Sequence, residues 1–290
     1  MAFVSFKHDY AFRELFSNEN VRKQFLSDVL ETPLEEIASV RVVSPYLRRR
    51  FRRQKLGILD MNMEMRDGTK VNIEMQTRCQ KHWVRRQLFY LTRMYSGDLK
   101  EGQEYAGLQK CVSISILDFN LIEDKEYHSV YRLRDKLGRE LTDLLEIHII
   151  ELCKKLEGMN AVNDWIRLFN AESEEDLEMI EAKNLGITEA IELLKNMNLR
   201  KSFRYLYEER LKAIRDRQAE DECVWDQGRE QGRVEGKAEA ILQLLDELGD
   251  MPSDLRVMIM AEKDMDTLNR WLKAAARAES IEQYREWTVK

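Results

Sequence analysis

The chain has 290 residues, of which 43% are hydrophobic and 34% are charged, and it has only three prolines. This apolar content can form a sizeable core, which argues against a disordered protein and predicts one domain with an appendage, or two domains. The N-terminal sequence MAFVSFKHDY lacks the apolar core of a signal peptide, and no stretch approaches the roughly 18 apolar residues of a membrane span. We therefore expect a cytoplasmic protein without a membrane partner.

Cysteine and histidine usage argues against two further kinds of site. The four cysteines lie far apart and form no Cys-x-x-Cys pair, and the four histidines stand alone. This pattern favours neither a disulfide framework nor a zinc site. A bound metal ion would therefore have oxygen ligands.

The net charge of -6 is unevenly distributed along the chain. Residues 1–120 hold 20 Lys and Arg against 15 Asp and Glu, whereas residues 121–290 hold 27 against 38. A basic first part and an acidic second part indicate that the first part meets a polyanion.

The first predicted elements are a helix and a strand. Apolar residues at helical spacing predict a helix from Asp9 to about Leu30, with Asp9 able to cap its start. The β-branched stretch from Val40 to Tyr46 predicts a strand. The basic run RRRFRRQK, from Arg48 to Lys55, follows as a connection.

Strict alternation of apolar and polar residues in LDMNMEMRDGTKVNIEMQ, Leu59 to Gln76, predicts two further strands. Apolar residues at helical intervals then predict a helix over Lys81 to Ser96 that stops at Gly97, a typical C′ residue. The β-rich run from Cys111 to Leu121 predicts a largely buried strand. The order is α-β-β-β-α-β, which indicates an α/β domain.

The next segment predicts a hairpin of Tyr127–Leu133 and Glu146–Leu152 around Gly138, although LTDLLEIHIIELCKK also fits a helix. Beyond Lys155 the spacing is helical, with a long charged segment from Lys201 towards Leu248. We expect an α/β domain over residues 1–152 and a helical C-terminal region over residues 153–290.

The C-terminal region carries Gly228, Gly232 and Gly236 four residues apart in a polar helix. A solvated helix is the simple interpretation, and close packing in a homo-oligomer through the C-terminal helices is the alternative, because each glycine costs a helix about 1 kcal/mol relative to alanine. Pro252-Ser253-Asp254 predicts the start of a final pair of short helices up to about Ala276.

The loop between the two alternating strands decides which of their side chains face each other. A two-residue turn at Asp67-Gly68 would set Asp60 opposite Met75 and mismatch the polar and apolar faces along the ladder. A three-residue loop, residues 66–68 with Gly68 in the left-handed region, instead sets Asp60 opposite Glu74. We predict this second register because both apolar faces then match.

Two directly opposed carboxylates destabilise a hairpin unless a cation offsets them, since their Cβ atoms lie about 4.5–5.5 Å apart. Mg²⁺ is bound by one or two carboxylates with water and substrate phosphate, which Asp60 and Glu74 would provide. A solvent-facing polar side of an antiparallel hairpin explains the same residues without any ion. The hairpin alone leaves both interpretations open.

Basic residues on either side of the hairpin favour the first interpretation. The helix after the hairpin places Arg86, Tyr90 and Arg93 on one face. A carboxylate pair would repel DNA by itself, so cations beside it suit metal ions held against a phosphate backbone. The predicted phosphate-binding residues are Arg48, Arg49, Arg50, Arg52, Arg53, Lys55, Arg86 and Arg93.

An Asp on one strand and Glu-x-Gln on the next, between an N-terminal helix and a helix with a strand, resembles the PD-(D/E)XK nuclease superfamily. Within it, HDYAFRELFSN, GILDMNME, NIEMQ, HWVRRQLFYLTRMYSG and YAGLQKCVSISILDF resemble the recombination-promoting nuclease (Rpn), or transposase-like, family over about residues 5–152. The tail GREQGRVEGKAEA is similar to the C-terminal tails of that family.

The resemblance implies a restriction-endonuclease-like αβββαβ core, a mixed sheet flanked by helices, and metal-dependent hydrolysis of DNA phosphodiester bonds in recombination or mobile elements. It implies Asp60, Glu74 and the Met75 carbonyl as ligands of Mg²⁺, or of another divalent cation such as Mn²⁺ or Ca²⁺. Gln76 stands where the superfamily has a lysine, and it would position the attacking water without supplying a charge.

Two other functions remain open from the sequence. One is a catalytically weak or inactive relative that binds DNA or assembles with a recombination partner. The other is a purely structural oligomer, which would not bind DNA at ~50 mM salt, where phosphate contacts are strongest.

Overall fold

The structure is a computed structural model, and it describes residues 3–37, 39–44, 46–47, 57–58, 60–97, 104–158 and 160–288. The basic run from Arg48 to Lys55, predicted to be a connection, lies outside these residues. The chain divides into two compact units, Met1–Glu208 and Glu209–Lys290.

The N-terminal helical segment is two helices, where the sequence predicts one. Helix α1 spans Asp9–Leu15 and α2 spans Glu19–Leu30. The chain breaks between them because the side-chain oxygen of Asn18 accepts hydrogen bonds from the N–H groups of Asn20 and Val21 and thereby caps α2. Asp9 does not cap α1, whose N-cap residue is His8.

Unit 1 is built on a six-stranded mixed sheet in the order β1-β4-β5-β6-β8-β7. The pairs β5–β6 and β6–β8 are parallel, and the other neighbours are antiparallel. The separate strands β2 and β3 pair antiparallel with each other. The strands are β1 Val40–Val42, β2 Tyr46–Leu47, β3 Gly57–Ile58, β4 Met61–Met65, β5 Lys70–Gln76, β6 Cys111–Leu117, β7 His128–Arg134 and β8 Glu140–Glu151.

Three predicted strands differ from the observed strands in their bounds or in the type of element predicted. The stretch from Val40 to Tyr46 is divided between β1 and β2. The buried strand that begins at Cys111 ends at Leu117, four residues earlier than predicted. The segment that fits either a helix or a strand is strand β8, and it pairs with β7 as the predicted hairpin around Gly138.

The β4–β5 hairpin has the predicted three-residue loop. The backbone N–H of Met65 donates to the carbonyl oxygen of Thr69 at 2.8 Å, and Gly68 has a φ of +89°. A Cβ atom at Gly68 would also lie 2.9 Å from Gln109 Oε1. The backbone conformation therefore favours glycine here, whereas the flexible Gln109 side chain could move to make room for a Cβ atom.

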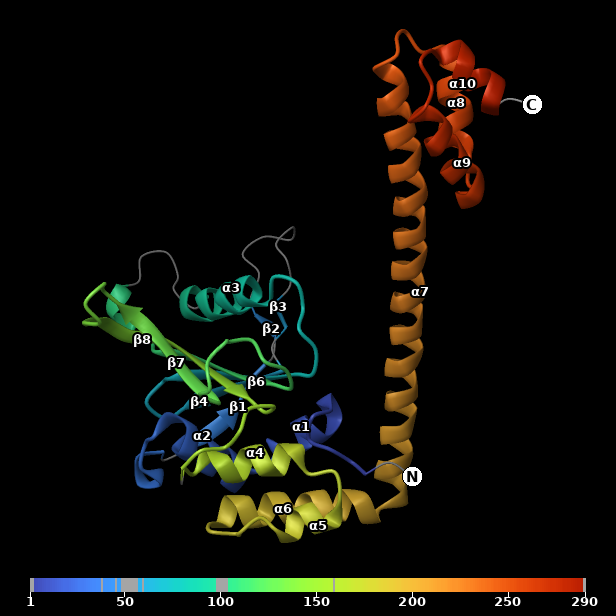
Figure 1. The fold of residues 1–290 in the computed structure, drawn as a ribbon. Helices are drawn as coiled ribbons and strands as arrows, with labels where there is room; N and C mark the ends of the chain where they lie inside the picture. The colour runs from blue at the N-terminus through green and yellow to red at the C-terminus, as the bar shows by residue number, and fades with distance from the viewer. Residues whose placement is uncertain are drawn as a thin grey trace. The chain divides into compact units, whose positions relative to one another are not determined.

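Helix α3, Trp83–Ser96, covers one face of the sheet, as Figure 1 shows. Its buried residues Trp83, Gln87, Leu91 and Met94 recur every three or four positions and so form one stripe. The helix ends at the predicted position, but Gly97 keeps a right-handed conformation with a φ of −68°.

The opposite face of the sheet packs on an aromatic core. Helices α2 and α4, Val162–Asn170, lie on this side in Figure 1. The rings of Phe12 and Phe16 are 4.9 Å apart between centroids, those of Phe16 and Phe25 are 5.0 Å apart, and those of Phe25 and Trp165 are 5.2 Å apart. These edge-to-face contacts join α1, α2 and α4 into one layer.

Unit 1 also contains α5, Glu174–Glu178, α6, Leu185–Leu199, and the chain up to Glu208. Helix α6 packs closely on α2, because a Cβ atom at Gly186 would lie 2.4 Å from the Cβ of Gln24. The three helices after β8 therefore belong to the first compact unit. The functional division at residue 152 stays a prediction.

Unit 2 is a small helical body. Helix α7 spans Lys201–Asp246 and belongs to this unit from Glu209 on, and three helices follow it, α8 Ser253–Ala261, α9 Met265–Ala275 and α10 Ile281–Thr288. They pack around Ile241, Leu245, Ile259 and Tyr284, among others. The sequence predicts α8 and α9 but not α10. Two short 3₁₀ turns, Leu34–Glu36 and Tyr105–Gly107, complete the described elements. Within them, no helix is both long and apolar enough to cross a membrane.

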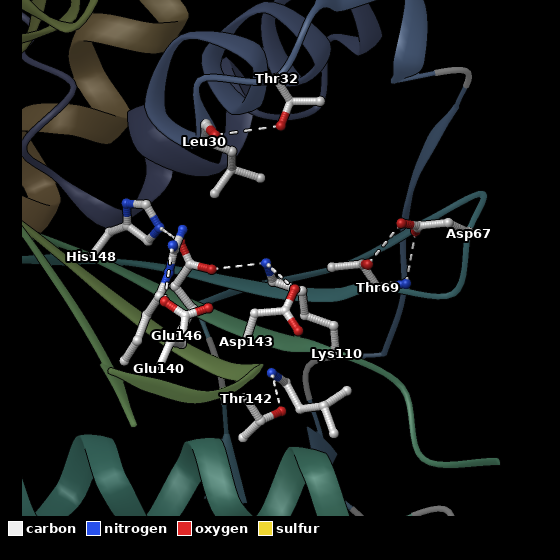
Figure 2. Close-up of polar contacts among 12 residues, drawn as sticks. Leu30, Thr32, Asp67, Thr69, Lys110, Glu140, Thr142, Asp143, Glu146 and His148 are labelled. Carbon is white, nitrogen blue, oxygen red and sulfur yellow. Dashed lines mark hydrogen bonds and ion pairs between the residues drawn. The ribbon is translucent and has the colours of Figure 1, made fainter. Parts of the chain in front are cut away.

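A polar network around the buried Glu146 joins β7, β8 and Lys110, the residue before β6, on the α2 side of the sheet; Figure 2 shows Glu146, His148 and Lys110. Glu146 accepts hydrogen bonds from His148 Nε2 at 2.8 Å and from Arg132 at 3.0 Å, and its other oxygen lies 2.8 Å from Lys110 Nζ. Burial alone would raise the pKa of Glu146, but these three donors lower it well below its usual range.

The network continues to a second histidine. His148 Nδ1 lies 2.9 Å from His128 Nε2. One of these two ring nitrogens donates the hydrogen and the other accepts it, so the contact joins β7 to β8. Burial, followed by the neighbouring His148, lowers the pKa of His128 to about 4, so His128 stays neutral near pH 7.

We predict that His128→Gln flattens the acid side of the stability profile. The folded-state pKa of His128 lies near 4 and its ordinary pKa near 6.5, so its contribution to stability is present above pH 6.5 and is lost as pH falls towards 4. Wild type should lose about 1–2 kcal/mol more than the variant between pH 7.5 and pH 5 in urea unfolding. His82→Gln, at an exposed histidine outside the network, is the control. Parallel profiles for wild type and His128→Gln would contradict the prediction.

Candidate active site

The hairpin places Asp60 and Glu74 beside each other on the α3 face of the sheet. Met61 pairs with Ile73 across β4 and β5, so the register continued by one residue sets Asp60 opposite Glu74. Glu74 raises the pKa of Asp60 through its charge, which agrees with this placement. The predicted register is confirmed over Met61–Glu64, and Asp60 lies directly before this ladder.

Glu74 is buried and held in place by α3. Gln87 Nε2 donates to Glu74 Oε2 at 2.5 Å, and Gln87 Oε1 in turn accepts from Ser113 Oγ of β6 at 3.2 Å. Asn72 Nδ2 lies 3.4 Å from the other oxygen of Glu74. A buried carboxylate with these partners has one fixed orientation.

The surroundings of Asp60 disfavour its ionised form. Burial raises the pKa of Asp60 most, and the negative charges of Glu74 and Asp9 raise it further, while Arg13 and Arg86 lower it. The result is a pKa of about 7. A carboxyl group whose ionised form is this unfavourable gains most from a nearby cation.

Gln76 and Met75 follow Glu74 at the end of β5. Gln76 is half-buried and lies two residues after Glu74, so both side chains belong to the α3 face. The Met75 side chain is buried on the opposite face, so only its backbone carbonyl is available to the site.

Arg86 lies closer to the carboxylates than the sequence indicates. Its Nη2 is 3.4 Å from Glu74 Oε2, its Nη1 donates to Gln80 Oε1 at 2.6 Å, and its guanidinium carbon is 5.9 Å from the centroid of the Tyr90 ring. Arg93 is half-buried further along α3. The other predicted phosphate-binding residues, Arg48 to Lys55, lie outside the described residues.

Residues 6–222 match the family described as PD-(D/E)XK nuclease family transposase. The chain belongs to this family. Comparisons with curated proteins and with solved structures found no match. Membership in a PD-(D/E)XK nuclease family agrees with the mixed sheet flanked by helices and with the carboxylates at its centre.

PD-(D/E)XK nucleases generally use divalent metal ions. Among the described residues, no three His, Cys, Asp or Glu side chains lie close enough to hold an ion together. Mg²⁺ needs only one or two carboxylates, with water or phosphate as the remaining ligands. Asp60 and Glu74 meet this smaller requirement.

Two buried oxygens beside Glu74 could accept hydrogen bonds from the water ligands of a hydrated cation. Asn72 Oδ1 and Ser115 Oγ are buried and accept no hydrogen bond from any residue that the structure describes. Ser115 pairs with Glu74 in the β5–β6 register. Buried acceptors without partners are rare and costly, and ordered water around an ion would satisfy them.

Sequence reasoning missed Gln87 as part of the site. Its position on the apolar stripe of α3, between Trp83 and Leu91, is the signal that could have found it. A long amide side chain on such a stripe needs a buried partner, which here is Glu74.

We predict that Asp60→Asn stabilises the metal-free protein at high pH. The folded-state pKa of Asp60 is raised to about 7, so the associated stability is present below its ordinary pKa and is lost as pH rises through 7. The variant should exceed wild type by about 2–4 kcal/mol at pH 8 in EDTA, and the difference should shrink as pH falls towards 4. Urea unfolding measures both. Glu64→Gln, on the same face of β4, is the matched control, and equal stabilities of Asp60→Asn and wild type at pH 8 would refute the prediction.

Proposed function

We propose that the protein is a metal-dependent DNA endonuclease that hydrolyses phosphodiester bonds, of the Rpn type, associated with recombination or mobile elements. The single observation that supports this most strongly is the placement of Asp60, directly before β4, near Glu74 of β5, where burial and the charge of Glu74 raise the pKa of Asp60 to about 7. Family membership supplies the nuclease class.

Each site residue has a proposed role. Asp60, Glu74 and the Met75 carbonyl would be the ligands of Mg²⁺, Mn²⁺ or Ca²⁺. When bound, such an ion supplies positive charge to the scissile phosphate and to the attacking water. Gln87 would hold Glu74 in one orientation through its 2.5 Å hydrogen bond.

Gln76 would position the water through a hydrogen bond. A neutral amide can orient water but cannot stabilise developing negative charge as a lysine would. Arg86 lies 3.4 Å from Glu74 and places a positive charge beside the site. Arg93 and the run from Arg48 to Lys55 would hold the DNA backbone without selecting a sequence.

Two observations favour a second function. Glu74 Oε2 is already paired with Gln87 and Arg86, and Gln76 replaces the superfamily lysine. A catalytically inactive DNA-binding protein of a recombination system would keep this arrangement without needing an ion. The same experiment separates the two functions.

We predict Mg²⁺-dependent nicking of supercoiled plasmid DNA by the wild-type chain, abolished by EDTA. Asp60→Ala and Glu74→Ala should reduce cleavage by at least about a hundredfold, because each removes a ligand of the ion, while DNA binding persists. Gel assays with Mg²⁺, Mn²⁺ and Ca²⁺ measure cleavage, and a filter-binding assay measures DNA binding.

The matched control is Glu64→Ala. Glu64 lies on the same strand face as Asp60, about 13 Å away at ~3.3 Å per residue, and its carboxylate pairs with Arg41 at 2.8 Å. This variant should cleave like wild type. Absence of cleavage with all three ions, together with DNA binding, would favour the inactive DNA-binding protein.

We also propose a homo-oligomer formed through the C-terminal helices. In α7, Val224 and Trp225 are 68% and 66% exposed, and Cβ atoms added at Gly228, Gly232 and Gly236 would meet nothing within 4 Å. An apolar pair beside a stripe of small residues suits close helix packing between copies.

Replacing all three glycines by leucine tests this proposal. If the glycines pack against a second copy, the bulky side chains should lower the mass measured by light scattering after size-exclusion chromatography. If the helix is only solvated, the variant should keep the wild-type mass and melt at a higher temperature, because each replacement favours the helix by roughly 0.5–1 kcal/mol. The second result would contradict the oligomer.

A further inference from the structure

We infer that a groove along α3 binds single-stranded DNA and presents it to the carboxylate site. The inference rests on the proposed nuclease function, which supplies DNA as the ligand, and it adds the strandedness of that DNA. It is carried by a cavity that joins exposed cations to exposed aromatic rings.

The groove is a cavity of about 540 Å³ at the start of α3. The side chains that matter for binding are Lys81, His82, Arg85, Arg86, Phe89 and Tyr90. Arg85, Arg86, Phe89 and Tyr90 lie on α3, which holds them in fixed relative positions, and Lys81 and His82 directly precede the helix. A ligand in the groove therefore meets a prearranged surface.

The charge of this surface selects a polyanion. Residues 77–97 contain five Lys and Arg residues and no Asp or Glu. Lys81 and Arg85 are exposed, and neither forms an ion pair with any residue that the structure describes. Unpaired cations in a groove are suited to successive phosphates of a nucleic acid.

The aromatic side chains distinguish an unpaired strand from a duplex. Phe89 is 38% exposed, although the core contacts of α3 are made by Trp83 and Leu91 on its other side. Its ring lies 5.8 Å from the ring of Tyr90, at an angle of 55°. A duplex hides the faces of its bases inside the stack, whereas an unpaired base can stack on such a ring.

Arg86 connects the groove to the carboxylates. It contributes to the lining of the groove, its guanidinium lies over the Tyr90 ring at 5.9 Å, and its Nη2 is 3.4 Å from Glu74 Oε2. A strand held in the groove would thus pass within a side chain's length of the proposed metal ligand.

Two other ligands of this surface, duplex DNA and a protein partner, would respond differently to the same substitutions. A duplex bound through its phosphates needs Lys81 and Arg85 but not the ring of Phe89. A protein partner would use the apolar residues on the exposed side of α3, where Val84 and Leu88 are 51% and 48% exposed. The experiment includes variants that separate both from a single strand.

The test is fluorescence anisotropy with the full chain in EDTA at about 50 mM salt, where phosphate contacts are strong. The probes are a labelled single strand of about 20 nucleotides and the duplex that this strand forms with its complement. Both probes are longer than the stretch of nucleic acid that the groove can contact. We expect tighter binding of the single strand. Phe89→Leu should weaken that binding by roughly tenfold and change duplex binding by less than about twofold, whereas Phe89→Trp should retain it.

Two further variants complete the test. Arg85→Gln should weaken binding of both probes and reduce the slope of log K against log salt by about 0.7 for the single strand. Leu88→Ala, one residue before Phe89 on the exposed side of α3, should leave single-strand binding unchanged. Circular dichroism checks that each variant is folded.

Three outcomes would overturn the inference: duplex binding as tight as single-strand binding, no effect of Phe89→Leu, or an equal loss in Leu88→Ala. Because binding is measured without a divalent ion, these outcomes are independent of cleavage. Absence of cleavage in the plasmid assay would refute the nuclease but would not contradict single-strand binding. Absence of preferential single-strand binding would refute this inference but would not contradict the nuclease.

Discussion

The register of the β4–β5 hairpin is the constraint on which the site depends. Side chains alternate between the faces of a sheet, so a slip by one residue would move Asp60 to the face opposite Glu74. The three-residue loop fixes the register, and it requires Gly68 at a φ of +89°. A glycine without any chemical role thus decides whether two carboxylates can approach the same ion.

The same alternation gives the two faces of the sheet different tasks. On one face, Glu74 is oriented by Gln87 of α3. On the other face, His148, Arg132 and Lys110 donate to the Glu146 carboxylate, and these donors lower the pKa of Glu146 despite its burial. Asp60 lacks this compensation and its pKa rises to about 7. The two acids therefore differ in their surroundings, since protein donors balance the charge of Glu146, whereas the surroundings of Asp60 disfavour its ionised form.

The sequence predicted those features that depend on neighbouring residues within one hairpin or helix. The alternating strands, the loop length and the opposition of Asp60 to Glu74 all follow from period-two alternation and turn geometry. The break at Asn18 was missed because apolar spacing continues across it, although its side chain caps α2. The contacts of Gln87 and Arg86 with Glu74 depend on how α3 sits on the sheet. Such contacts join residues from separate elements, and no spacing within one element encodes them.

Arg86 shows why the identity of the cation matters here. Its guanidinium donates to Gln80, lies near Glu74 and faces the ring of Tyr90. A planar group with five N–H donors can serve a carboxylate, an amide and a ring at once, because its donors point in fixed directions. A lysine has one compact charge and no planar face for stacking. An arginine at this position can therefore balance Glu74 and still take part in the groove, and exchange for lysine is not conservative.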